Sequence, residues 1–490
     1  MQKVMHTRQP LICETVTARR MADFRALRDA AGGADLVEVR LDSVPDPDVA
    51  GALLGLTRPI VVTCRPRDEG GGFQGSEPER RALLLGALEG GADFVDLEWG
   101  RGFDAEIRRR HGRNVVFSTH DFEGIPADLD ARVDAMVASG AEVVKVAVMV
   151  SRVAACARLA AIARRHAGRR LVLIAMGEAG VVTRICPARF GSCWTYAGAA
   201  VAPGQISVDA LHREFGFRRV GAHSAIYGIA GRPVGHSLSP AMHNAAFEAL
   251  GVDAVYVPLA VADVPDLFES AEALGLAGAS VTAPYKVAVM AGLAAVDPQA
   301  AEIGAVNTLT RGSDGWQGRN TDAQGFLAGL ADVDLRALRV AVLGTGGAAR
   351  AVAVAARQSG AVVTCYGRDA GRVRAIAETL HIDGGMRPVP RHAWDVLVNA
   401  TPVGTRPAVE TSAFPEGTYD GRIVYDLVYN PPITRMMRDA AWEGRRTIGG
   451  LDMLVAQARK QTEYWTGRQP DEAVMREAAR WKLSTLTDRT

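Results

Sequence analysis

The 490-residue sequence has few of the features that mark membrane, secreted or nucleic-acid-binding proteins. No apolar run approaches the roughly 20 residues that a transmembrane helix needs. Its 56 basic and 55 acidic residues leave a net charge of +1, so the charge balance predicts no nucleic acid and no anionic membrane as a partner. The segment before the first predicted strand is too short for a signal or transit peptide, and we therefore expect a cytoplasmic protein.

Cysteine is also scarce, and its spacing excludes the usual metal-binding patterns. The six cysteines are scattered along the chain without paired ligand spacing, so the sequence predicts reduced thiols and no metal site. A composition of 48% hydrophobic and 23% charged residues is typical of globular proteins. A chain of this length exceeds one ordinary core and predicts two to four domains.

Short β-rich segments alternate with helical segments through the first 210 residues. The predicted strands are 11–18, 35–42, 59–65, 93–99, 114–121, 143–150, 171–177 and 193–200. Helical periodicity is found between them, for example at 80–91 and 157–168. Eight such units predict an α/β fold with an N-terminal (β/α)8 TIM barrel. An open doubly wound sheet is the alternative, although no Gly-rich phosphate loop follows the first strand.

The stretch "EVVKVAVMV" places Lys145 within an apolar run that is typical of a strand buried on both sides. Desolvating a charge costs several kcal/mol unless it is compensated. Two interpretations remain open from these residues alone. Lys145 is either an edge lysine whose amine reaches water, or a buried lysine whose pKa falls until the neutral amine becomes a nucleophile.

Polar residues gather at or just after the ends of the predicted barrel strands. They are Glu38, Arg40, Arg65, Glu69, His120, Lys145, Arg184 and Gln205. Active sites of such barrels lie at the C-terminal ends of the strands, so we expect these side chains to converge on one site. Taken singly, Glu38 and Arg40 could form a structural ion pair, and His120 could be a core histidine.

A polar segment at 212–224 ends the barrel pattern, and a second unit follows. The loop "GRPVGHSLSP" carries Ser237 and Ser239, two residues apart, and a helix is predicted to begin near Pro240. Both hydroxyls could bind a polyhydroxy acid. The alternative is that Ser239 is an ordinary helix N-cap.

The segment 338–372 is predicted to form a strand, a Gly-rich loop, an Ala-rich helix and a second strand. Gly344, Gly346 and Gly347 would let the backbone approach a pyrophosphate at the helix N-terminus. After the second strand, Arg368 and Arg372 favour a 2′-phosphate and therefore NADP, because guanidinium binds phosphate.

Asp369 argues in the opposite direction, since an acidic residue at the end of this strand is typical of NAD-binding sites.

The motifs of the first half, in order, resemble those of type I 3-dehydroquinate dehydratase over nearly all of residues 10–210. They are "VEVRLD", "TCRPRDEGG", "FSTHDF", "VVKVAVM", "AMGEAGVVTRI" and "APGQI". The resemblance implies that Lys145 forms an imine with the substrate ketone, that His120 is the general acid/base and that Glu69 orients it. It implies that the carboxylate and hydroxyls are bound by Glu38, Arg40, Arg65, Arg184 and Gln205.

This sequence departs from the family pattern at three positions of the barrel. Val201 stands where Ser is usual, Glu178 where Lys is common, and Val150 where Pro is common. The missing hydroxyl at Val201 would remove one substrate contact.

The second half resembles shikimate dehydrogenase over roughly residues 225–480. The matching stretches include "GHSLSPAMHN", "SVTAPYK", "GAVNTL", "GRNTDAQG", "VLGTGGAARA", "VNATPVG", "YDLVYNPPIT" and "GGLDMLVAQA". The resemblance implies a catalytic pair, Lys286 and Asp322. It implies a substrate pocket formed by Ser237, Ser239, Thr282, Asn307, Tyr429 and Gln457. It implies NADP binding by Gly344, Gly346, Gly347, Ala348, Arg368, Arg372, Asn399 and Thr401.

A lysine beside a carboxylate suits the expected chemistry, because reduction of a ketone leaves an alkoxide that needs a proton. Four positions depart from this second pattern. They are Ser280 (commonly Asn), Gly367 and Asp369 (commonly Asn and Thr) and Asp452 (commonly Gly).

We therefore expect a bifunctional enzyme that dehydrates 3-dehydroquinate and then reduces 3-dehydroshikimate to shikimate with NADPH. The expected domains are a barrel at 1–218, a substrate domain at 224–330 rejoined by 450–490, and a Rossmann-type NADP domain at 331–449. The partners are these small molecules, with no nucleic acid and no membrane. The alternatives are an NAD-linked quinate/shikimate dehydrogenase fused to a dehydratase, and a catalytically dead ligand-sensing regulator.

Overall fold

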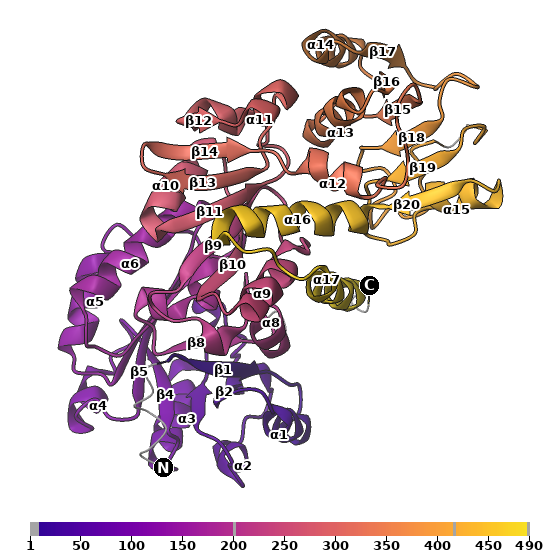
Figure 1. Cartoon of the computed structure of the whole chain (residues 1–490). Helices are drawn as coiled ribbons and strands as arrows, with labels where there is room; N and C mark the ends of the chain where they lie inside the picture. The colour runs from indigo at the N-terminus through magenta and orange to yellow at the C-terminus, as the bar shows by residue number, and fades with distance from the viewer. Residues whose placement is uncertain (1–8, 199–201, 415–417, 488–490) are drawn as a thin grey trace. The chain divides into compact units, whose positions relative to one another are not determined.

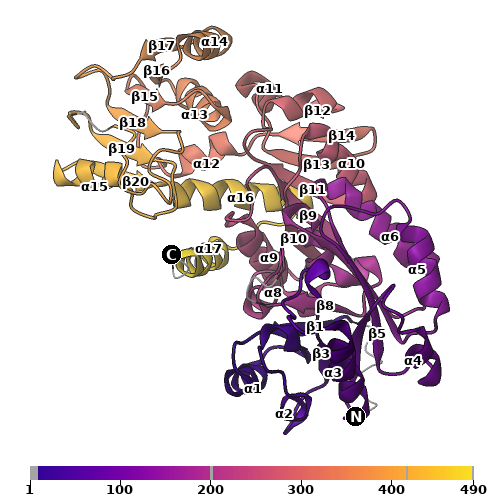
Figure 2. The ribbon, with the colours of Figure 1, turned by 180° about the vertical axis from the view of Figure 1, so that it is seen from behind.

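The computed structural model describes residues 9–198, 202–414 and 418–487. Figures 1 and 2 show the chain from two opposite sides. By internal contacts the chain divides into two units. The first comprises Met1–Ile226 with Asp253–Leu276, and the second comprises Tyr227–Val252 with Ala277–Thr490. None of the described helices is both long and apolar enough to span a bilayer. All six cysteines are free thiols.

The first unit contains the predicted eight-stranded parallel barrel. Its strands are β1 (Leu11–Val16), β2 (Leu36–Arg40), β3 (Ile60–Thr63), β4 (Phe94–Glu98), β5 (Val115–Asp121), β6 (Val143–Met149), β7 (Leu171–Met176) and β8 (Trp194–Ala197). Their order is β7-β6-β5-β4-β3-β2-β1-β8, with β1 paired to both β2 and β8. A bridge between Leu171 and Ser192 joins the remaining edge. The barrel prediction is confirmed.

Helices follow the strands and surround the barrel (Figure 1). They are α1 (Met21–Ala30), α2 (Val49–Leu53), α3 (Glu77–Glu89), α4 (Asp104–Arg109), α5 (Leu129–Ala138), α6 (Cys156–Arg165), α7 (Val181–Ile185) and α8 (Val208–Arg213). The start of α3 shows the local cause of one such element. Ser76 and Glu79 form a capping box there, which satisfies backbone donors that the first turn leaves unpaired.

Inside the barrel, a layer of apolar side chains lies on the N-terminal side of a layer of polar side chains. The apolar layer includes Cys13, Leu36, Val61, Phe94, Val116, Val143 and Trp194. Side chains of a strand return to the same face every second residue, so the next inward positions are two residues further along each strand. These positions hold Thr15, Glu38, Thr63, Asp96, Ser118, Lys145 and Tyr196. The bulky lower layer therefore supports a polar upper layer at the C-terminal ends of the strands.

A six-stranded sheet follows the barrel in the order β10-β9-β11-β13-β14-β12. Its strands are β9 (Ala225–Ala230), β10 (Ala254–Leu259), β11 (Leu276–Val281), β12 (Ala295–Val296), β13 (Thr308–Gly312) and β14 (Gly315–Arg319). The accompanying helices are α9 (Ser239–Leu250), α10 (Val264–Leu274), α11 (Pro298–Ile303), α12 (Asp322–Ala328), α16 (Gly450–Thr466) and α17 (Glu472–Thr487). Helix α9 begins at Ser239, and Leu238 occupies the cap position, so the alternative that Ser239 is the N-cap is wrong.

The third sheet is fully parallel, in the order β17-β16-β15-β18-β19-β20. Its strands are β15 (Arg339–Leu343), β16 (Val362–Gly367), β17 (Asp383–Met386), β18 (Val396–Asn399), β19 (Ile423–Asp426) and β20 (Arg446–Gly449). Helices α13 (Gly347–Gln358), α14 (Ala370–Leu380) and α15 (Arg435–Trp442) pack against it. The predicted strand, Gly-rich loop, helix and strand are confirmed, and the sheet is Rossmann-type.

Candidate active sites

One cavity at the C-terminal ends of the barrel strands brings together all eight residues predicted for the first site. It is lined by Glu38, Arg40, Arg65, Glu69, His120, Lys145, Arg184 and Gln205. Residues 199–201 lie outside the described parts of the chain, and the departure from the family pattern at Val201 lies among them. A separate cavity of about 960 Å³ is bordered by the loops after β2 and β3 and contains none of these eight residues.

Lys145 lies in the middle of β6 and is only 5% exposed, so the edge-lysine interpretation is wrong. Its Nζ lies 2.9 Å from Asp96 Oδ2 and 3.5 Å from Glu38 Oε1. It also lies 4.1 Å from the centre of the Tyr196 ring. Both carboxylates and the ring face attract a positive charge. Lys145 is thus buried as the apolar run predicted, and it is surrounded by counter-charges that the sequence did not reveal.

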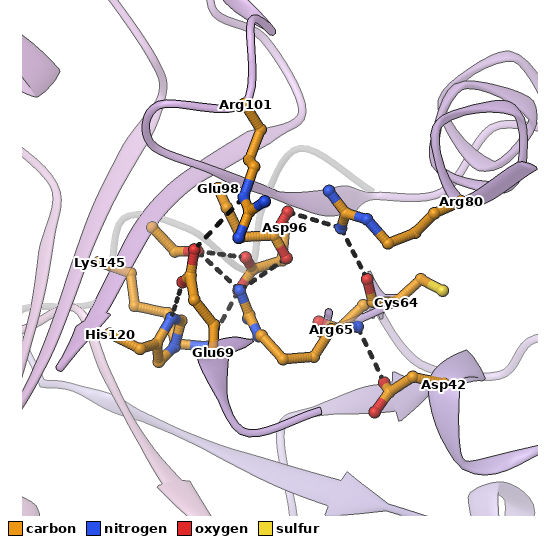
Figure 3. Close-up of polar contacts among 12 residues, drawn as sticks. Asp42, Cys64, Arg65, Glu69, Arg80, Asp96, Glu98, Arg101, His120 and Lys145 are labelled. Carbon is orange, nitrogen blue, oxygen red and sulfur yellow. Dashed lines mark hydrogen bonds and ion pairs between the residues drawn. The ribbon is translucent and has the colours of Figure 1, made fainter. Parts of the chain in front are cut away.

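Asp96 and Glu98 are buried acidic residues that were not predicted from the sequence. Arg65 contacts both, with 2.8 Å from Nη2 to Asp96 Oδ2 and 2.8 Å from Nη1 to Glu98 Oε1 (Figure 3). Burial alone would raise the pKa of Asp96, but the charges of Arg65 and Lys145 outweigh it and hold that pKa well below its usual range. Burial raises the pKa of Glu98. The sequence did contain a sign of this pair. Asp96 and Glu98 are two residues apart in the apolar strand "DFVDLEW", so both side chains lie on the same face of that strand.

His120 and Glu69 form a pair at the edge of the same cavity. His120 Nδ1 lies 3.1 Å from Glu69 Oε2, and Figure 3 shows both side chains beside Lys145. Burial, together with the nearby charges of Arg65 and Lys145, holds the pKa of His120 well below its usual value. Burial raises the pKa of Glu69 to about 7, although the charge of Arg65 opposes that rise. The imidazole is therefore neutral at physiological pH and available to accept a proton.

Arg184 differs from the other cations of the cavity because no carboxylate pairs with it among the described residues. The side chain is 2% exposed, and its Nη atoms donate long bonds of 3.4 Å to the carbonyls of Tyr196 and Pro203. Its Nε has no hydrogen-bond partner among the residues that the structure describes. Burial lowers the pKa of Arg184 to about 10. A buried guanidinium of this kind suits a carboxylate-bearing ligand.

Arg40 and Gln205 are held by local contacts. Arg40 forms an ion pair with Asp42, with 2.7 Å from Nη2 to Oδ2, and the Glu38–Arg40 pair that the sequence left open is not formed. The Oε1 of Gln205 accepts a bond of 3.0 Å from the backbone N–H of Ala202. Both side chains are thereby fixed at the rim of the cavity.

A second cavity, of about 210 Å³, lies in the second unit and gathers the residues predicted for the second site. It is lined by Ser237, Ser239, Thr282, Lys286, Asn307, Asp322, Tyr429 and Gln457. The Nζ of Lys286 donates a short hydrogen bond to Asp322 Oδ2. Asn307 Nδ2 donates to the other oxygen of Asp322 at 2.8 Å. The carboxylate is thus fixed from two sides, and it holds the ammonium group at the cavity wall.

Gln461 and Ser280 line this cavity as well, and sequence analysis assigned a role to neither. Ser280 Oγ donates to Gln461 Oε1 at 2.8 Å, and Gln461 Nε2 donates to the carbonyl of Asn307 at 3.1 Å. Gln457 and Gln461 are four residues apart on α16, so they share one helix face. That spacing could have identified Gln461 once Gln457 was predicted.

The Gly-rich loop borders a third cavity of about 540 Å³. Gly344 has φ +128°, and a Cβ there would lie 2.9 Å from the carbonyl oxygen of Ala400. A Cβ on Gly347 would lie 3.1 Å from Lys286 Cδ, so this glycine lets the lysine pack against the start of α13. A Cβ on Gly346, which lines this cavity, would meet no atom within 4 Å, so the loop leaves open space there for the close approach of a pyrophosphate. Ala348 lines the second cavity as well.

The predicted cofactor residues do not all face these cavities. Thr401, Arg368 and Arg372 line the third cavity together with Arg387, which sequence analysis missed. Asn399 is fully buried, and its Nδ2 donates to Asp426 Oδ1 at 2.8 Å. Its Oδ1 accepts a hydrogen bond of 3.0 Å from the backbone N–H of Thr401, so Asn399 stabilises the loop that follows β18 and does not face the cavity.

Together, the fold and these cavities define an α/β protein with a polar cavity at the C-terminal ends of a parallel barrel and, in a later part of the chain, a Rossmann-type sheet with a Gly-rich loop. The family model of type I 3-dehydroquinase matches residues 12–221. The model of the shikimate dehydrogenase substrate binding domain matches residues 229–309, and that of the shikimate 5′-dehydrogenase C-terminal domain matches 450–480.

Curated relatives cover both halves. The bifunctional 3-dehydroquinate dehydratase/shikimate dehydrogenase of Arabidopsis thaliana, described as chloroplastic, is 34% identical over 89% of this chain and 78% of its own length. A shikimate dehydrogenase (NADP(+)) of Microcystis aeruginosa is 39% identical over 53% of this chain and 97% of its own. The chain belongs to the bifunctional 3-dehydroquinate dehydratase/shikimate dehydrogenase family. It is an enzyme of the shikimate pathway, with a lyase half and an oxidoreductase half.

Solved structures are similar to the second half. A shikimate dehydrogenase in complex with NADP+ is 32% identical over 54% of this chain and 97% of that chain, with a TM-score of 0.50. The shikimate dehydrogenase of Aquifex aeolicus is 31% identical over 53% of this chain and 99% of that chain, also with a TM-score of 0.50.

Proposed function

We propose that the barrel dehydrates 3-dehydroquinate through an imine on Lys145, and that the second unit reduces the product, 3-dehydroshikimate, with NADPH. The observation that carries the first step is the position of Lys145 Nζ, buried among carboxylates and one ring in the cavity that holds His120 and Arg184. The observation that supports the second is the fixed Lys286–Asp322 pair.

In the dehydratase, Lys145 attacks the ketone carbon and water leaves as the imine forms. Glu38 is within reach to take the proton that the ammonium group must lose before attack, while Asp96 stays charged as the counter-ion of Arg65. The positive imine acidifies the neighbouring C–H, and neutral His120 removes that proton. His120 then returns the proton to the departing hydroxyl, and hydrolysis frees Lys145. Arg184 binds the substrate carboxylate.

In the reductase, NADPH bound along the Gly-rich loop would supply the hydride. The open space beside Gly346 leaves room for its pyrophosphate, and Arg368 and Arg372 would hold its 2′-phosphate. Lys286 donates the proton that the new alkoxide requires, and Asp322 keeps that ammonium group in place. Asn307 orients Asp322, while Ser237, Ser239, Thr282, Tyr429 and Gln457 bind the hydroxyls and carboxylate of the substrate.

A coupled assay tests both halves at once. Purified protein is mixed with 3-dehydroquinate and NADPH, and nucleotide absorbance is followed. Oxidation of NADPH without a second enzyme supports the proposal. A protein that consumes 3-dehydroquinate but oxidises no nucleotide would limit the activity to the barrel. A strong preference for quinate with NAD would replace the proposed reductase by the NAD-linked alternative.

We also propose three domains, with limits 1–218, 224–330 rejoined by 450–490, and 331–449. We further propose that the protein is cytoplasmic and that neither reaction uses a metal ion. Limited proteolysis with mass analysis tests the limits. Cleavage confined to the segment between 212 and 224 and to the ends of the nucleotide domain is expected, and stable fragments with other boundaries would contradict it.

A further inference from the structure

Arg387 lies in the nucleotide cavity beside Arg368 and Arg372. Strands β16 and β17 are parallel, with Gly367 opposite Met386. The backbone N–H of Arg387 donates to the carbonyl of Gly367 at 3.1 Å. The residues that follow each strand, Arg368 and Arg387, therefore leave the sheet edge next to one another. Strand pairing thus brings a third guanidinium to the end of β16.

These three guanidinium groups have no ion-pair partner within the described residues, although the charge of Arg372 acts on the carboxylate of Asp369. No ion pair joins any of them to a carboxylate in the parts of the chain that the structure describes. Arg387 is half-buried, and burial together with the positive charge of Arg368 lowers its pKa. Like charges held together without an anion repel one another. A cavity built in this way favours an anionic ligand.

Asp369 is the acidic residue at this rim, and its carboxylate serves the helix. Its Oδ1 accepts a 2.9 Å bond from the backbone N–H of Arg372, as the N-cap of α14. That bond lowers the pKa of Asp369. The carboxylate is directed at the helix end, where its charge also suits the helix dipole. The argument that Asp369 favours NAD is weakened accordingly.

Gly367 also fits this arrangement. A Cβ at this position would lie 2.6 Å from Val373 Cγ2 and 3.3 Å from Thr345 Cγ2. A side chain at position 367 therefore has no room, and any polar contact at this rim must come from another residue. Arg387, which follows the paired strand β17, lines the same cavity.

We propose that Arg387 joins Arg368 and Arg372 in binding the 2′-phosphate of an adenine nucleotide, and that it is a determinant of the preference for NADP over NAD. The proposal rests on the proposed reductase function. A guanidinium fork binds phosphate oxygens in a bidentate manner, which a 2′-hydroxyl does not permit.

Binding measurements without turnover test this role. Calorimetric titration compares adenosine 2′,5′-bisphosphate with adenosine 5′-monophosphate on the full-length protein. The Arg387→Gln variant is expected to bind the bisphosphate about tenfold more weakly, because one charge-assisted contact is lost. It should bind the monophosphate within about twofold of wild type, which also reports a folded domain. Arg391→Gln is the matched control, since Arg391 is an exposed arginine of the same segment outside the cavity.

The outcomes separate this inference from the proposed function. If wild type prefers the bisphosphate and Arg387→Gln keeps that preference, the role of Arg387 is overturned and an NADP-linked reductase still stands. An equal loss in Arg391→Gln would also overturn it, because the effect would then be general electrostatics. If wild type shows no preference for the bisphosphate, the choice of NADP fails as well.

Discussion

Lys145 Nζ lies 2.9 Å from Asp96 Oδ2, and Arg65 Nη2 lies 2.8 Å from the same carboxylate oxygen. Asp96 is fully buried and therefore balances two cations in the interior of the barrel. An isolated ammonium group at this depth would cost several kcal/mol. The position of the lysine thus depends on an acidic residue of a different strand.

Replacement of Asp96 by Asn should destabilise the barrel strongly. The change leaves Lys145 and Arg65 with one fewer counter-charge, and breaking a buried ion pair costs about 3 kcal/mol or more. Denaturant unfolding followed by intrinsic fluorescence measures the loss. Asp46→Asn, at an exposed position, should change the free energy of unfolding by less than about 0.5 kcal/mol. Equal effects of the two substitutions would contradict the role of Asp96.

Replacement of Arg184 by Met should separate stability from activity. Removing a buried guanidinium that lacks a carboxylate partner is expected to stabilise the protein by about 1 kcal/mol or more. The same change should raise KM for 3-dehydroquinate at least about a hundredfold, because a buried charge-assisted contact to the substrate carboxylate is lost. Thermal unfolding and dehydratase kinetics measure the two effects. Unchanged KM in a folded variant would exclude Arg184 from substrate binding.

The sequence predicted the barrel and most residues of its cavity, and the reasons are physical. An apolar run around Lys145 identifies a buried strand, and barrel closure brings residues after successive strands to one face. Asp96 was missed although its alternation with Glu98 was visible. Its pairing with Lys145 depends on strand neighbours far apart in sequence.

Contacts between segments far apart in the sequence also explain why the predicted cofactor residues of the second unit differ from those that line its cavity. Arg387 reaches the nucleotide cavity through pairing of β17 with β16, which no local pattern specifies. Asn399 belongs to a recognised motif, but motif membership does not reveal that its side chain points to Asp426 beneath the loop. Local signals therefore predict the elements, and only the packing shows which side chains face a cavity.

The pH dependence of the dehydratase should report Glu69. Its pKa is raised to about 7, so the carboxylate becomes charged as the pH rises through 7 and then stabilises the imidazolium that His120 forms. We expect kcat to rise with an apparent pKa near 7. Glu69→Gln should lower kcat about tenfold or more and remove that inflection.

The pKa of His120 is lowered. Protonation of His120, which would abolish its action as a base, should therefore lower kcat only at a pH more acidic than the inflection of Glu69. Initial rates between pH 5 and pH 9 measure both features. An inflection near pH 7 that survives in Glu69→Gln would assign it to another group.

The two sites should be silenced independently. Lys286→Met removes the proton donor of the reductase and should lower the rate at which added 3-dehydroshikimate is reduced by at least about a hundredfold. It should leave dehydration of 3-dehydroquinate within about twofold, since Lys286 and Lys145 line different cavities. Lys145→Met should show the reverse. Loss of both activities from either single change would contradict separate sites.

Reductive trapping tests the central claim most directly. Protein is treated with borohydride in the presence and absence of 3-dehydroquinate, and intact mass and peptide mapping are recorded. The imine account predicts a stable adduct on Lys145 that forms only with the ligand and is missing in Lys145→Met. An unchanged mass, or an adduct on another side chain, would contradict it.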